Sequence, residues 1–272
     1  MASVNITSQQ GRCSIVFNER RPKRPIAISS RPRSLSGPTV SEKDYQRDPE
    51  LQAAIDSLFA DTVHKDRTRL HRADIQHHID RIVALGSRLG LNRVHPQWNI
   101  GTFKPLITTN TTGVTMDEVC TLQRFTFGQV RPSDLKVELG DSLQIRGPIP
   151  GVEGSAANSY MLENYFKFLE SGLLGIMTPE GVYDTSEEEP GRLGVTFCGF
   201  KIRPVRTETQ SLSLWRELLA EHNPSMDDEG VISFTFPKPL SATLNYIVME
   251  PDLHMSLGGS GDLLVVQRRQ PM

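Results

Sequence analysis

The stretch LKVELGDSLQIR, residues 135–146, decides the expected fold. Apolar and polar residues alternate on both sides of Gly140-Asp141-Ser142, which is the pattern of two half-buried strands joined by a tight turn. We therefore expect a β-hairpin here, with one face packed and the other in water, as is typical of antiparallel sheets.

Other stretches of the chain predict further strands and helices. Asp48-Pro49 predicts a helix start, because aspartate caps the first amides and proline is tolerated at the first helical position. Since the strands come in runs, the expected fold is α+β, a mostly antiparallel sheet covered by about four helices. The remaining strands are expected over residues 193–205, 231–236, 243–249 and 263–268, and the remaining helices over residues 65–89, 159–172 and 211–222.

Charge is unevenly distributed along the chain, whose net charge is -2. Residues 1–47 carry nine basic and three acidic side chains, a net of +6, so the other 225 residues carry -8. Prolines recur through the basic stretch and exclude a continuous helix or a central strand there. We expect two parts, a flexible basic N-terminal arm over residues 1–47 and a single globular α+β domain over residues 48–272.

The arm is the strongest candidate for a binding site. Arginine presents a planar fork of donors that matches phosphate oxygens, and an extended cationic segment can follow a polyanion. The run RRPKRP, residues 20–25, also resembles a nuclear import address, and a solubilising tail without a partner is the third interpretation. The candidate nucleic-acid-binding residues are Arg20, Arg21, Lys23, Arg24, Arg31 and Arg33.

Candidates for catalysis or metal binding are weaker. On a helix, His71, Asp74 and His78 would share one side and could bind a metal or line a pocket. The chain has no His-Glu-x-x-His run, no Gly-x-Ser-x-Gly elbow and no zinc spacing among its three cysteines. A strand pattern, rather than a helix, follows the glycine-rich residues 258–261, so we expect a connection between strands there. We expect no metal, no cofactor and no catalytic residue.

These patterns favour a non-enzymatic structural, assembly or interaction protein. Its basic arm would contact nucleic acid or an anionic surface while its body self-associates into a homo-oligomer, an architecture analogous to that of viral matrix and coat proteins. The alternatives are a nuclear regulatory or movement-type factor with an import signal, and an enzyme of unrecognised family using the His71, Asp74 and His78 face. We expect an intracellular protein, in the cytoplasm or nucleus, with no signal peptide and no transmembrane segment.

Overall fold

The computed structural model describes residues 45–65, 70–110, 119–126, 128–148, 158–205, 212–223 and 225–269. The six candidate cationic residues of the arm lie outside these ranges. Within the described part of the chain, no helix is long and apolar enough to cross a membrane.

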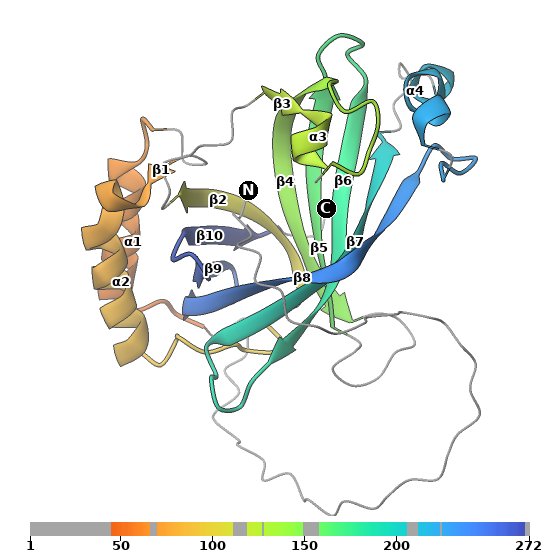
Figure 1. Ribbon diagram of the computed structural model, residues 1–272. Coiled ribbons are helices and arrows are strands. Elements are labelled where there is room, and N and C mark those ends of the chain that lie inside the picture. The colour runs from red at the N-terminus through yellow and green to blue at the C-terminus, as the bar shows by residue number, and fades with distance from the viewer. Residues whose placement is uncertain are drawn as a thin grey trace, which may run out of the picture.

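Eight antiparallel strands form a closed barrel (Figure 1). Each strand pairs with the next along the chain from β4 to β10, and β2 closes the ring by pairing with both β10 and β4. The predicted sheet covered by four helices is therefore wrong, because the fold is mostly β and the sheet closes on itself. The strands are β2 (Gly101–Asn110), β4 (Lys136–Pro148), β5 (Asn158–Phe168), β6 (Leu174–Thr185), β7 (Arg192–Pro204), β8 (Ile232–Met249), β9 (Leu253–Gly258) and β10 (Leu263–Arg268).

The seam that closes the barrel is short. Strands β2 and β4 pair only from Gly101 to Phe103 on one side and from Gln144 to Arg146 on the other. Beyond this seam each strand gains a short extra partner: β1 (Leu70–His71) runs parallel to β2, and β3 (Val119–Thr121) runs antiparallel to β4.

Two helices cover one side of the barrel (Figure 1). Helix α1 (Pro49–Asp61) begins as predicted, with the Asp48 carboxylate accepting from two backbone amides. Helix α2 (Gln76–Arg88) follows a 3-10 turn (Arg72–Ile75) and is shorter than predicted. Each fully buried aliphatic side chain between these helices and the barrel contributes roughly 1.5–3 kcal/mol. This second core includes Leu51, Ile55, Leu58, Ile79 and Ile82 from the helices, and Ile107, Val248, Met255 and Val265 from the strands.

The predicted hairpin over residues 135–146 is a single strand with a β-bulge. Leu139 pairs with Phe166 and Ser142 pairs with Asn164, so β4 advances three residues while β5 advances two. One extra residue reverses the face that every later side chain occupies. Val137 points into the barrel before the bulge, and Arg146 points into it afterwards, which places polar residues inside.

One predicted helix was wrong, and two predicted strands are continuous. Residues 159–172 form strand β5 and a turn instead of a helix, with Tyr160, Phe166 and Phe168 buried on alternating positions. The two strands predicted over residues 231–236 and 243–249 are one bent strand, β8. The strands predicted over residues 193–205 and 263–268 are confirmed as β7 and β10.

Apolar side chains from the barrel strands and from two short helices form the larger core. Short helix α3 (Leu122–Phe125) and helix α4 (Leu212–Leu219) contribute Phe125 and Trp215 to the same core as Phe166. The Trp215 ring nitrogen donates to the Gly230 carbonyl oxygen over 2.9 Å, so the buried indole is satisfied. Helix α4 and the 3-10 turn after it (Ala220–His222) confirm the helix predicted over residues 211–222.

Candidate functional site

The first described residues of the chain are anchored on the barrel. The Tyr45 hydroxyl donates to Glu250 Oε1 over 2.6 Å, and Arg47 Nε donates to Glu250 Oε2 over 2.6 Å. A second guanidinium nitrogen of Arg47 lies 3.1 Å from Asp252 Oδ1. Residues 45–47, which were predicted to belong to the arm, therefore contact the body.

Burial controls the chemistry of this anchor. Glu250 is fully buried, and burial raises the pKa of its carboxyl, an effect that the contacts with Tyr45 and Arg47 oppose. Burial also raises the pKa of Tyr45, so its phenol stays protonated and donates. The Tyr45 ring packs edge-on to Trp98 at 5.6 Å, and Trp98 stacks on His95 at 4.2 Å. The anchor thus combines a buried charge pair with an aromatic contact.

A polar centre lies inside the barrel beside the closing seam. Arg146 is 2% exposed, and its Nη1 lies 2.8 Å from Asn99 Oδ1 and 3.2 Å from His254 Nδ1. The same nitrogen donates to the Tyr246 hydroxyl over 2.5 Å, and Nη2 donates to Gln144 Oε1 over 2.6 Å. All four partners are neutral groups, since burial raises the pKa of Tyr246 and lowers that of His254.

Aromatic rings surround the same guanidinium. The Arg146 Cζ atom lies 4.6 Å from the ring centre of Phe103 and 5.5 Å from that of Tyr160. Among the described residues, no carboxylate forms an ion pair with Arg146. The centre is therefore a buried positive charge held by neutral acceptors and ring faces, an arrangement suited to attracting an anion.

The predicted grouping of His71, Asp74 and His78 does not form. His71 lies in β1 and Asp74 in the 3-10 turn, and both are exposed, so the spacing of a continuous helix does not apply to them. His78 is buried, and its Nε2 lies 2.8 Å from Asp61 Oδ2. In the described ranges, the three potential ligands within 4.8 Å of one another are Asp61, His77 and His78.

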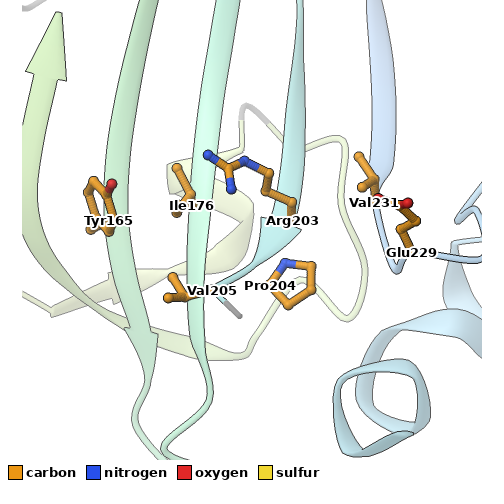
Figure 2. Close-up of a pocket in the computed structure, with 7 residues that line it drawn as sticks. All are labelled: Tyr165, Ile176, Arg203, Pro204, Val205, Glu229 and Val231. Atoms are coloured by element: carbon orange, nitrogen blue, oxygen red, sulfur yellow. The ribbon is translucent and has the colours of Figure 1, made fainter. Parts of the chain in front are cut away.

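An open pocket of about 360 Å³ lies on the outer surface of β5, β6 and β7 (Figure 2). The Arg203 guanidinium borders it but is already 2.8 Å from Glu163 Oε1. Burial, together with nearby Glu163, raises the pKa of Tyr165, so this phenol is protonated. The pocket surface is about as polar as it is apolar. Its lining residues are Tyr165, Ile176, Arg203, Pro204, Val205, Glu229 and Val231.

No family model matches this chain, and no curated protein matches it.

Proposed function

We propose that this protein is a non-enzymatic assembly or interaction protein whose basic N-terminal segment binds nucleic acid or another polyanion. The observation that carries this proposal is the division of charge. Residues 1–44, here called the basic segment, have a net charge of +5, and residues 45–272 have -7. Residues 20–33 contain six cationic side chains and no acidic one.

The anchor supports the same division of roles. Arg47 is held by Glu250 and Asp252, so its charge belongs to the body and not to the basic segment. A polyanion approaching the acidic body is repelled, whereas neutralisation of phosphates by the basic segment releases condensed counterions and drives binding. The anchor fixes the point on the body at which a bound polyanion would be held.

Self-association of the body is the second part of the proposal. Helix α4 and the turn between β5 and β6 line a common pocket through Leu218, Glu170 and Ser171. Exposed leucines occur on both elements: Leu212 and Leu214 are 38% and 54% exposed, and Leu169 and Leu174 are 41% and 38% exposed. Apolar side chains grouped in this way favour a protein contact. Sedimentation should give a homo-oligomer that Leu214→Glu dissociates. A monomeric wild-type protein would remove this part of the proposal.

A full-length variant tests polyanion binding. Replacing all six candidate cations, Arg20, Arg21, Lys23, Arg24, Arg31 and Arg33, with glutamine should lower the affinity for a 20-nucleotide RNA or DNA by at least about 100-fold at moderate salt. Fluorescence anisotropy measures the affinity. The control removes the same charge from the body by replacing Lys65, Lys104, Lys136, Lys167, Lys201 and Lys238, all exposed. Equal losses in the two variants would contradict the proposal.

The run at residues 20–25 favours a second candidate, a nuclear regulatory or movement-type factor, because import receptors recognise such clusters. In either case we propose an intracellular location, in the cytoplasm or the nucleus. Fusing residues 18–28 to a neutral reporter should concentrate the reporter in nuclei if the second candidate is right. An unchanged distribution would count against it.

A further inference from the structure

The polar centre around Arg146 contains more hydrogen-bond donors than acceptors. Arg146 Nε, Asn99 Nδ2 and His254 Nε2 are all buried, and none has a hydrogen-bond partner of good geometry. The orientation of Asn99 follows from its partners, because its Oδ1 accepts from both Arg146 and Tyr246 over 2.8 and 3.1 Å. Its amide nitrogen is thus left as a donor.

The tautomer of His254 follows in the same way. Arginine can only donate, so His254 Nδ1 must accept from Arg146, and the proton of the neutral ring sits on Nε2. That nitrogen faces the backbone carbonyls of Trp98 and Glu250 without forming a well-aligned hydrogen bond. Arg146 Nε and the Asn99 amide nitrogen therefore lack an acceptor, and His254 Nε2 has no well-aligned one.

Charge makes this surplus more costly. A guanidinium stays protonated in proteins, and buried charges are normally paired. Neighbouring Arg268 adds a second positive charge. Its nitrogens donate to the carbonyl oxygens of Pro251, Ile100 and Trp98, each over 2.6 Å. The centre thus lacks both an anion and the acceptor atoms that an anion would bring.

We propose that this centre binds the carboxylate of a small organic acid inside the barrel. A carboxylate offers two acceptor oxygens for the donors that lack one, Arg146 Nε and Asn99 Nδ2, and one negative charge for the single charge of Arg146. The rings of Phe103, Tyr160 and Tyr246 enclose the guanidinium and provide contacts for an apolar tail. A phosphate dianion fits less well, because His254 is neutral and Arg268 is engaged by carbonyl groups. This site is independent of the basic segment and goes beyond the proposed function.

Octanoate is the probe, tested on the full-length protein by calorimetry and by thermal unfolding. Octanoate should bind the wild-type protein and raise its unfolding midpoint at constant ionic strength, while octanol and inorganic phosphate should not. Arg146→Lys should weaken binding at least about 10-fold, because lysine carries its charge on one ammonium group and has no counterpart of the Nε donor. Arg203→Gln, at the outer pocket, is the matched control and should leave binding unchanged.

A second variant keeps the proposal testable if changes at Arg146 impair folding. Asn99→Asp has nearly the same shape and places a carboxylate 2.8 Å from Arg146 Nη1, where it substitutes for the ligand. It should raise the unfolding midpoint of the free protein and abolish octanoate binding. Octanoate that fails to bind the wild-type protein, phosphate that binds more tightly than octanoate, or an Asn99→Asp variant that still binds octanoate would each overturn the proposal.

Discussion

Removing the cation from the anchor should destabilise the protein measurably. Arg47→Met keeps most of the aliphatic stem but removes the charged hydrogen bond to Glu250, whose side chain is fully buried while that of Arg47 is 20% exposed. Hydrogen bonds to charged groups contribute about 1.5–3 kcal/mol, and breaking a fully buried ion pair costs about 3–5 kcal/mol. Because Arg47 is partly solvated and Tyr45 still donates to Glu250, we expect a loss of about 2 kcal/mol in the free energy of unfolding.

A double-mutant cycle isolates the pair. Glu250→Gln should also cost about 2 kcal/mol, and the double variant only slightly more, which gives a coupling of about 1.5 kcal/mol in urea denaturation at pH 7. The cost of Arg47→Met should shrink on acidification, because a protonated Glu250 no longer needs a cation. The exposed pair Lys104–Asp141, at 3.3 Å, is the control and should show a coupling below about 0.5 kcal/mol. A coupling equally small for Arg47 and Glu250 would refute the anchor.

Two further predictions concern the barrel interior. Gly175→Ala should cost about 1–3 kcal/mol, because the added Cβ overlaps the Phe166 ring, whereas Gly147→Ala, with no neighbouring atom within 4 Å, should change stability by less than about 0.5 kcal/mol in urea denaturation. Burial lowers the pKa of His254 well below 6.5. The neutral ring therefore contributes fully to the free energy of unfolding above pH 6.5. Below pH 6.5 this free energy falls by about 1.4 kcal/mol per pH unit, until the pH reaches the folded-state pKa. His254→Gln should remove one proton from the slope of stability against pH, and an unchanged slope would contradict this assignment.

Local sequence patterns predicted individual helices and strands better than they predicted strand continuity and barrel closure. The cap at Asp48 was readable because it acts within one turn. The bulge at Gly140-Asp141 was not readable from the sequence. A turn and a bulge use the same residue types, and only the pairing with β5 distinguishes them. Closure of the barrel depends on the contact between β2 and β4, some forty residues apart, which no local pattern encodes.

The same bulge explains why the centre around Arg146 was missed. In sequence, Leu143 and Ile145 mark the expected inner face, and Gln144 and Arg146 the solvated one. The extra residue in β4 exchanges these faces and turns the arginine inward. A charged residue after an unrecognised bulge gives no signal of its burial. Likewise Asp61 comes from α1, and only the packing of α1 on α2 brings it to His78.

The dependence of polyanion affinity on salt tests the central claim most directly. If the six cations of residues 20–33 each neutralise one phosphate, the logarithm of the binding constant for duplex DNA should fall against the logarithm of salt concentration with a slope of about -5, and of about -4 for a single strand. The six-site glutamine variant should show a slope near zero. A slope shallower than about -1 for the wild-type protein, or the same slope for the variant, would contradict a polyanion-binding role for the basic segment.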